Sequence, residues 1–346
     1  MDPRARRGPS RRARLGLAVL AVLVVNAGST SLKLHVVEGE ESRKVDSLEQ
    51  DVDAVVHRIV HGGARFREPV VIDKTVRAEI AALEALAPLH NAPALDAIEE
   101  ARRTLPDVPH AAVFDTAFHA TIPDEAATYA VRQEWRDWGV RRYGFHGLSV
   151  QWAAERVRAQ RLVVCHLGGG SSVSAVRDGK SIDTTMGFTP LEGVPMTTRS
   201  GSVDPGAILY LLRERGLDVA TLEHELNLES GLKALAGGSG DMREIVAAGG
   251  GLALDVYAYR VAAAVAAMSA GLRGLDALVF TAGIGERSPL VRARVCERLA
   301  FLGVELDPAR NEQAEPDCMI SAGVVAVHVV RAREELVAAR AAQLLL

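Results

Sequence analysis

The chain has 346 residues, of which 48% are hydrophobic and 4% aromatic, and its formal net charge at pH 7 is −4. This composition excludes a disordered protein, and the mild negative charge gives no sign of a nucleic-acid-binding surface, so we expect a small-molecule substrate and two α/β domains. The three cysteines, Cys165, Cys296 and Cys318, have no metal or redox spacing and favour a reducing cytoplasm.

The N-terminus imitates a signal peptide, because residues 1–14 are basic and residues 15–25 are apolar. The apolar run is too short to span a bilayer, and it leads directly into Asn26 and the first predicted hairpin. We therefore expect residues 1–20 to be a disordered basic extension or the product of an upstream start codon chosen in error. Export or membrane attachment is the alternative.

The first predicted hairpin covers residues 24–39, VVNAGSTSLKLHVVEG. Displaced by 140 positions, it lies without gaps over residues 164–179, VCHLGGGSSVSAVRDG, so that Gly28 matches Gly168. Each copy has a strand, a small-residue turn, an alternating strand and a second turn. Such a repeat predicts two related halves that each offer one hairpin to a shared cleft; a chance match among small residues is the alternative.

A second strand is predicted over residues 55–60, followed by a turn at 61–63. Arg58 lies among its apolar neighbours, where a cation is costly unless it is paired. It is either half of a satisfied ion pair or a ligand for phosphate or carboxylate. Helices are predicted over 74–87, ended by Pro88, and over 94–103, with a loop at 89–91.

Two polar residues stand out in the following segment. Asp115 interrupts the apolar run of residues 111–118, where an unpaired acid is expensive to bury, so it is a candidate for positioning or metal contacts, with a capping aspartate as the alternative. His146 stands between Phe145 and Gly147 in the stretch RRYGFHGLS. A histidine in this setting is either a satisfied structural residue or part of a site.

The central hairpin, residues 162–174, predicts a phosphate cradle. Its three glycines, Gly168, Gly169 and Gly170, lack Cβ atoms, so the backbone can take positive φ and approach an anion, while Ser171 and Ser172 add hydroxyl donors. An ordinary hairpin also favours glycine, so that reading stays open. The next segment, residues 183–206, is too long and too rich in Gly, Pro and Thr for an ordinary connection and is predicted to be a functional loop carrying Arg199.

The sequence of the last third of the chain predicts two further glycine turns that precede helices. Asp241 follows a glycine turn and is placed to cap a helix. Residues 252–272 predict a buried helix. Residues 278–288, LVFTAGIGERS, predict a strand, a glycine turn and a helix start, which is an arrangement that receives phosphate. A strand over 324–330 and a helix from about Glu334 close the chain.

Nine of these motifs, in this order, resemble those of acetate kinases. They are HRIVHGG, APLHN, FDTAFH, RRYGFHG, HLGGGSS, DTTMGFTPLEG, TRSGSVDPG, GDMRE and FTAGIGE, and the resemblance runs from about residue 22 to the C-terminus. It implies an α/β fold of two ribonuclease-H-like domains (duplicated βββαβαβα, the actin-like ATPase fold) around a nucleotide cleft. The implied domains are residues 21–119 with 336–346, and residues 120–335.

The resemblance also implies an activity, namely reversible transfer of a phosphoryl group from ATP to acetate, which gives ADP and acetyl phosphate, with Mg²⁺ or else Mn²⁺. It further implies a cytoplasmic homodimer without nucleic-acid or membrane partners. In-line transfer to a carboxylate needs charge neutralisation and alignment more than covalent chemistry. Because acetate is already ionised at neutral pH, we assign Asp115 to orientation and metal-water contacts rather than to proton abstraction.

The implied site residues fall into four groups. The residues around the transferring phosphoryl group are Arg58, Asp115, His146 and Arg199. The pocket for the acetate methyl, beside Arg58, is formed by Val60, Leu89, Phe145 and Pro190. The nucleotide site is formed by Lys33, His166, Leu167, Gly168, Gly169, Gly170, Asp241, Met242, Arg243, Gly283, Ile284, Gly285, Glu286 and Arg287. The metal residues are Asn26 and Glu334.

The chain departs from the family pattern at several points. Gly169 and Arg287 each stand where the family usually has asparagine, and Ala332 and Arg333 replace a Thr-Asn pair before Glu334. The segment between the first hairpin and HRIVHGG is also much shorter than usual. These changes bear on nucleotide preference, metal geometry and turnover.

Two alternative functions remain open. A kinase of propionate or butyrate differs from an acetate kinase by one or two methylenes, each worth only about 1 to 3 kcal/mol in an apolar pocket. A catalytically weak nucleotide-binding regulator would account for Gly169 and Arg333. A Rossmann dehydrogenase is disfavoured, because no GxGxxG follows a strand with an acidic residue at the proper distance.

Overall fold

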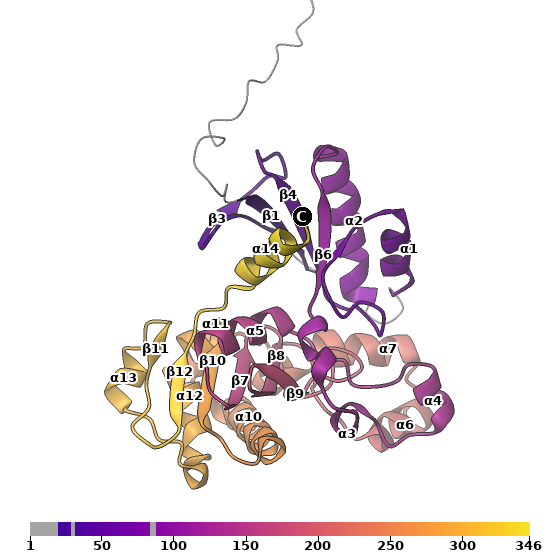
Figure 1. The fold of residues 1–346 in the computed structure, drawn as a ribbon. Coiled ribbons are helices and arrows are strands. Elements are labelled where there is room, and N and C mark those ends of the chain that lie inside the picture. The colour runs from indigo at the N-terminus through magenta and orange to yellow at the C-terminus, as the bar shows by residue number, and fades with distance from the viewer. Residues whose placement is uncertain (1–19, 29–31, 84–87) are drawn as a thin grey trace, which may run out of the picture.

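The computed structural model describes residues 20–28, 32–83 and 88–346, with only the backbone of 88–90. The extension predicted over residues 1–20 lies outside the described residues except for Leu20. Figure 1 shows two α/β parts, one above the other, with the C-terminus in the upper part.

The strands form two sheets of six. The first sheet consists of β1 (Ala21–Ala27), β2 (Leu32–Glu38), β3 (Glu41–Val45), β4 (Ala54–Ile59), β5 (Val70–Val71) and β6 (His110–Phe114). The second consists of β7 (Arg161–Leu167), β8 (Ser171–Arg177), β9 (Lys180–Thr184), β10 (Ala277–Thr281), β11 (Cys318–Met319) and β12 (Ala326–Val329).

The helices lie between and after these strands. The first half holds α1 (Lys74–Ala82), α2 (Pro88–Thr104), η2 (Ala117–Thr121), α3 (Asp124–Ala127), α4 (Gln133–Asp137) and α5 (Gly147–Arg156). The second half holds α6 (Pro205–Glu214), α7 (Val219–His224), η3 (Glu225–Glu229), α8 (Gly231–Ala236), α9 (Met242–Ala247), α10 (Gly251–Leu272), α11 (Ala282–Arg287), α12 (Pro289–Glu297), η4 (Ala300–Leu302), α13 (Pro308–Glu312) and α14 (Glu334–Leu345).

The two sheets have the same strand order. The first runs β3-β2-β1-β4-β6-β5, and the second, read from its other edge, runs β9-β8-β7-β10-β12-β11. In each sheet an antiparallel three-stranded meander is followed by two strands parallel to its first strand and by one antiparallel edge strand. The duplicated α/β fold expected from the sequence is therefore confirmed.

The repeat is confirmed for the first strands and slips by one residue afterwards. Strands β1 and β7 lie 140 positions apart from end to end. However, the last pair of the first hairpin is Ala27 with Leu32, whereas that of the second is Leu167 with Ser171. The second turn is thus one residue shorter, so the gapless match does not continue into β8.

Helices cover both faces of each sheet, because side chains alternate between faces along a strand. In β1, Leu23 and Val25 pack on the side of α2, whereas Val22 and Val24 belong to a second cluster with α14. The second sheet is covered by α10 on one face and by α5 on the other. Helices α14 and α5 touch each other, so one apolar core joins the two parts (Figure 1).

The structure corrects one helix boundary. Pro88 does not end the first predicted helix but begins α2, and residues 89–91 are helical rather than a loop. Proline fits the first position of a helix, where its missing N–H is not needed. Helix α1 ends at Ala82, and residues 84–87 lie outside the described residues.

Helix α10 has the length and apolar composition of a membrane span, and 44% of its most apolar window is buried inside the protein. It is the helix predicted over 252–272. Leu254, Val261 and Val265 are among its side chains that pack on the second sheet. The apolar side chains of α10 therefore form part of the hydrophobic core that covers the second sheet.

Candidate active site

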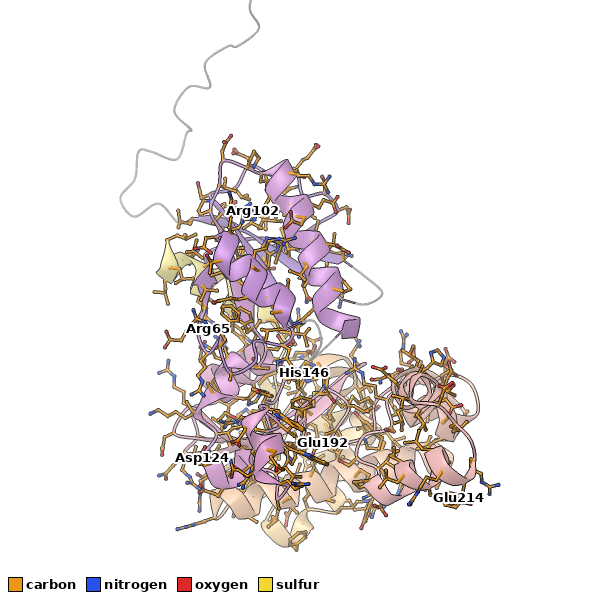
Figure 2. All side chains as sticks on the ribbon, turned by 90° about the vertical axis from the view of Figure 1, so that its right-hand side faces the viewer. Arg65, Arg102, Asp124, His146, Glu192 and Glu214 are labelled. Atoms are coloured by element: carbon orange, nitrogen blue, oxygen red, sulfur yellow. The ribbon has the colours of Figure 1, made fainter. Side chains whose placement is uncertain are left out.

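The predicted site residues gather at the carboxyl ends of parallel strands from both sheets. Asn26 and Arg58 are neighbours at the ends of β1 and β4, and Asp115 follows β6. His166 lies near the end of β7, directly before the glycine turn. Ligands of open α/β sheets bind at this edge. Figure 2 shows His146 where the upper and lower parts meet.

Arg58 forms an ion pair with two carboxylates. Its Nε and Nη2 donate to Asp115 Oδ1 and Oδ2 at 2.7 and 2.6 Å, and its Nη1 lies 2.9 Å from Glu334 Oε2. Burial raises the pKa of Asp115, whereas the Arg58 guanidinium lowers it. Both Asp115 oxygens accept hydrogen bonds from Arg58, which favours the ionised carboxylate. The two carboxylates in turn raise the pKa of Arg58 and so oppose the effect of its desolvation. We therefore treat Asp115 and Arg58 as ionised. One guanidinium facing two carboxylates leaves the cluster with an excess negative charge.

Two stacked histidines lie beside this cluster. The rings of His146 and His166 are 4.0 Å apart, and their Nδ1 atoms lie 3.0 Å from Ser172 Oγ and 2.8 Å from Ser149 Oγ, respectively. Burial lowers the pKa of His166 to about 3 and that of His146 well below its usual range. Both imidazoles are therefore neutral at pH 7 and can form hydrogen bonds without contributing charge.

The backbone of His146 is left-handed, with φ = 60°. Such a conformation is uncommon for a residue with a Cβ atom and is held only where the surroundings enforce it. Here His146 caps the start of α5, and the N–H of Gly147 donates to the carbonyl of Asp115 at 2.9 Å. The strained turn thus ties His146 to the strand end that carries Asp115.

In the glycine turn after β7, Gly170 is required for space rather than for positive φ, whereas a Cβ atom at Gly169 would have no atom within 4 Å. None of Gly168, Gly169 and Gly170 has positive φ, contrary to the conformation we predicted. A Cβ atom at Gly170 would lie 3.1 Å from His146 Nε2 and 3.7 Å from Arg199 Nη1, so His146 and Arg199 face the same point of the turn. The predicted role of Ser171 and Ser172 as phosphate donors is wrong, because both are fully buried and bonded to Tyr257 and His146.

Two adjoining cavities meet at this turn. The larger, of 1520 Å³, is lined by Gly168, Gly169, Asp241, Met242, Arg243, Gly283, Ile284 and Arg287, among others. The smaller, of 650 Å³, is lined by Asn26, Lys33, Arg58, His146, His166, Gly168, Gly169, Gly170, Gly283, Glu286, Arg287 and Glu334, among others. Gly168, Gly169, Gly283 and Arg287 line both, so the two cavities adjoin at this turn.

Five residues predicted for the phosphoryl group and the acetate pocket line neither cavity, namely Asp115, Arg199, Val60, Phe145 and Pro190. Three other predicted residues do not contribute a described side chain to the cavities either. Leu167 is fully buried in the core of the second sheet. Gly285 lines neither cavity, and its carbonyl accepts a hydrogen bond from the buried Arg292. The side chain of Leu89 lies outside the described residues, so its predicted place in the acetate pocket has no structural description.

The remaining apolar candidates for the acetate pocket lie close to Arg199. Phe145 forms a buried cluster with Met186 and Met196, and Val60 packs against it. The carbonyl of Pro190 accepts a hydrogen bond from Arg199 Nη1 at 3.3 Å. Sequence reasoning missed the two methionines, whose positions in the long irregular loop gave no periodic signal.

The sequence also gave no signal for two links between the nucleotide loops and the rest of the site. The carboxylate of Glu286 accepts a hydrogen bond from the N–H of Ala332, just before α14. The N–H of Thr197 donates to the carbonyl of Gly169 at 3.2 Å. Both bonds join segments far apart in the chain.

The donor set around Glu334 fits Mg²⁺. Asn26 and Glu334 offer oxygen atoms to the smaller cavity, and the excess negative charge beside Arg58 favours a cation. Among the described residues no group of three His, Cys, Asp or Glu could hold a metal ion by itself. Mg²⁺ commonly uses one or two carboxylates, several waters and the phosphates of its substrate.

Comparison with known proteins gives one consistent family. The model of the acetokinase family matches residues 40–340. The acetate kinase of Protochlamydia amoebophila is 46% identical over 84% of this chain and 76% of that protein. The acetate kinase of Deinococcus deserti is 46% identical over 94% of this chain and 91% of that protein. Among solved structures, a propionate kinase from Francisella tularensis has a TM-score of 0.87 and 34% identity, and covers 94% of this chain and 100% of that one.

Proposed function

The chain belongs to the acetokinase family, and on that premise we propose that it is an acetate kinase that transfers the γ-phosphoryl group of ATP reversibly to acetate. The observation that carries the proposal is that His146 and Arg199 converge on the glycine turn shared by the two cavities, while Arg58 lines the smaller cavity together with His146. The larger cavity suits the nucleoside, and the smaller suits the phosphates and the carboxylate.

We propose that Arg199 neutralises charge on the equatorial oxygens of the transferring group, which is the main requirement of this reaction. His146 is neutral, and we assign it the tautomer in which Nδ1 accepts from the Ser172 hydroxyl and Nε2 donates a hydrogen bond to the transferring group. Asp115 and Glu334 orient Arg58, which binds the acetate carboxylate. No general base is needed, because acetate is already ionised.

Asn26 and Glu334 would hold Mg²⁺ together with the phosphates, and the ion would supply further charge neutralisation at the β- and γ-oxygens. The nucleotide lies against the loops that carry Asp241 and Gly283, and Lys33 reaches the smaller cavity from β2. Arg287 lines both cavities and is placed to contact the phosphates in the position where the family usually has asparagine.

We propose that the acetate methyl binds against the apolar cluster of Val60, Phe145 and Met186, with Pro190 beside Arg199. Its walls include two methionines, which adapt their shape readily. Propionate is therefore the second candidate substrate, and one solved structure of the family is a propionate kinase.

We propose the domain division 21–119 with 336–346, and 120–335, so that the site lies between domains that close on the substrates and exclude water. Helix α14 contacts β1, β4 and β6, which supports its place in the first domain. The three cysteines carry no disulfide, which supports a place in the cytoplasm.

We also propose a homodimer. Helix α6 is apolar but has no buried residue, and Leu209 and Tyr210 are about half exposed. A second copy would cover this face. Sedimentation should show a dimer that Leu209→Glu shifts toward monomer; a wild-type chain that sediments as a monomer at micromolar concentration would contradict it.

The test of function is trapping of acyl phosphate by hydroxylamine with purified protein, ATP and Mg²⁺, comparing acetate, propionate and butyrate. We expect the strongest signal with acetate. A stronger signal with propionate would identify a propionate kinase. Folded protein that binds ATP but gives no signal with any acid would support the regulator instead.

A further inference from the structure

Residues 185–204 form a long loop without helix or strand that carries both Pro190 and Arg199. Such a loop needs external contacts to hold catalytic groups in one geometry. Its first part is held by three side chains, Tyr129, Arg142 and Glu192, which we call the loop clamp. Figure 2 shows Glu192 in the lower part, below His146.

The peptide units of Gly187 and Phe188 are bound on all sides by residues distant in sequence. The carbonyl of Gly187 accepts from the N–H groups of Tyr143 and Gly144 at 3.0 and 3.3 Å. The N–H of Phe188 donates to the Tyr129 hydroxyl at 3.0 Å. The carbonyl of Phe188 lies 3.2 Å from Nε2 of the buried His61. Because His61 Nδ1 accepts from the N–H of Gly63, Nε2 carries the proton and donates to Phe188.

Glu192 closes the clamp. Its Oε1 accepts from Arg142 Nη2 at 3.0 Å, and its Oε2 accepts from the Tyr129 hydroxyl. The other terminal nitrogen of Arg142 donates to the consecutive carbonyls of Thr184, Thr185 and Met186. A Cβ atom at Gly187 would meet the Glu192 carboxylate at 1.6 Å, so the clamp closes directly over a glycine.

The clamp joins the two segments that carry the phosphoryl-binding groups. On one side, Gly144 leads directly to Phe145 and His146. On the other side, the loop returns through Pro190, whose carbonyl accepts from Arg199 Nη1. Removing Glu192 would leave Arg142 Nη2 and the Tyr129 hydroxyl without this partner in a largely buried setting, which loosens both segments.

We propose that Glu192 is a positioning residue that, through Tyr129 and Arg142, fixes the distance between His146 and Arg199. The proposal rests on the proposed carboxylate kinase function. It predicts that the clamp affects turnover and carboxylate binding, while the nucleotide loops on the far side of the glycine turn keep their affinity for ATP.

The test compares Glu192→Ala with Glu192→Gln. We expect Glu192→Ala to lower kcat by about 10²-fold, the scale of a misplacement of about 1 Å, with the KM for ATP unchanged. In Glu192→Gln, the amide oxygen can still accept from Arg142, and the amide nitrogen can donate to the Tyr129 hydroxyl oxygen. We therefore expect kcat of Glu192→Gln to lie within about threefold of the wild-type value.

The matched control is Asp276→Ala, since Asp276 forms a similar multiple contact with Arg161 at the amino ends of β7 and β10, away from the site. It should lower the melting temperature without changing kcat. If Glu192→Ala does not fold, Tyr129→Phe carries the same test, because it removes one hydroxyl and should lower kcat by about tenfold.

Folded clamp variants with wild-type kcat, or a kcat loss in Asp276→Ala of the same size, would overturn the proposal. A loss in Glu192→Gln as large as in Glu192→Ala would also overturn it, because geometry would then not be the cause. If the wild-type protein forms no acyl phosphate, both the proposed function and the role of Glu192 are contradicted. If the wild type is active and the clamp variants have the same kcat, only the role of Glu192 is contradicted.

Discussion

At the scale of single residues, the site depends on pairings that hold charged and neutral donors around one glycine turn. Arg58 is oriented by Asp115 and Glu334, and His146 is kept neutral by burial beside His166. In the proposed reaction, the neutral imidazole and the buried guanidinium would bind the same anionic group in different ways, because only the arginine contributes charge. Substitutions at single positions should therefore separate charge from geometry.

Arg199→Ala tests charge. We expect turnover to fall by on the order of 10³-fold, the scale of an arginine that stabilises a phosphoryl-transfer transition state. The KM for ATP should stay close to the wild-type value. Steady-state rates of acyl phosphate formation measure both quantities, and a loss of turnover below about tenfold would contradict the assigned role.

Gly170→Ala tests geometry. Its backbone φ is not positive, so alanine fits the chain, but the new Cβ would lie 3.1 Å from His146 Nε2 and displace the ring. We expect turnover to fall by about tenfold or more without unfolding. The matched control is Gly271→Ala in α10, where no atom lies within 4 Å of the added Cβ. Equal turnover in Gly170→Ala and the wild type would show that His146 tolerates displacement.

At the scale of elements, the last helix connects the two ends of the chain. Helix α14 begins at Glu334, packs on the first sheet and contacts α5 of the other part. Its first residue pairs with Arg58 at the end of β4. The position of this helix therefore determines the position of Glu334, the proposed carboxylate ligand of the metal.

Glu334→Ala should weaken the response to Mg²⁺. We expect the Mg²⁺ concentration for half-maximal rate to rise by about tenfold or more, because the proposed carboxylate ligand is lost. Asp276→Ala, which removes a carboxylate that lines neither cavity, is the control and should change it little. Titration of Mg²⁺-dependent ATP binding provides a second readout. A variant with an unchanged Mg²⁺ response would remove Glu334 from the metal site.

At the scale of the whole molecule, the fold buries several histidines in neutral form. Burial is the largest cause that lowers their pKa values. The pKa values are lowered to about 3 for His57 and His166 and to about 4 for His61 and His119. Three of these residues, His57, His61 and His119, line neither of the two cavities, so the effect concerns stability as well as function.

The free energy of unfolding should therefore fall with pH below 6.5. In the unfolded chain these histidines become protonated near pH 6.5, whereas in the native state they stay unprotonated down to about pH 4. Stability is complete above pH 6.5 and is lost as the pH falls, by about 1.4 kcal/mol per pH unit for each histidine.

Urea unfolding at pH 7.5, 6.5 and 5.5 measures this slope. The control variant His57→Leu removes one titrating group outside the cavities and should reduce the slope by about one proton. A stability that is constant between pH 7 and 5 would show that the unfolded chain does not gain these protons.

Local patterns were sufficient for much of this protein. The strand–turn–strand pattern of residues 162–174 and its copy 140 positions earlier predicted both hairpins and the duplicated fold. A helix beginning at Glu334 and the cap at Asp241 were also predicted, because caps and hydrophobic periods depend on neighbours along the chain. The family resemblance placed most of the residues that line the smaller cavity.

Only the tertiary structure decided which groups meet. The sequence left open whether Arg58 was paired; its partners Asp115 and Glu334 lie far along the chain, and no local pattern specifies which strand ends come together. The glycines of the central turn were predicted for their φ, but none has positive φ, and only Gly170 is needed for the space that His146 and Arg199 occupy. The loop clamp likewise depends on contacts across more than sixty residues, such as that of Tyr129 with Glu192. Side-chain pairing of this kind follows from how the two sheets and their helices pack, and packing is a property of the whole fold rather than of any segment.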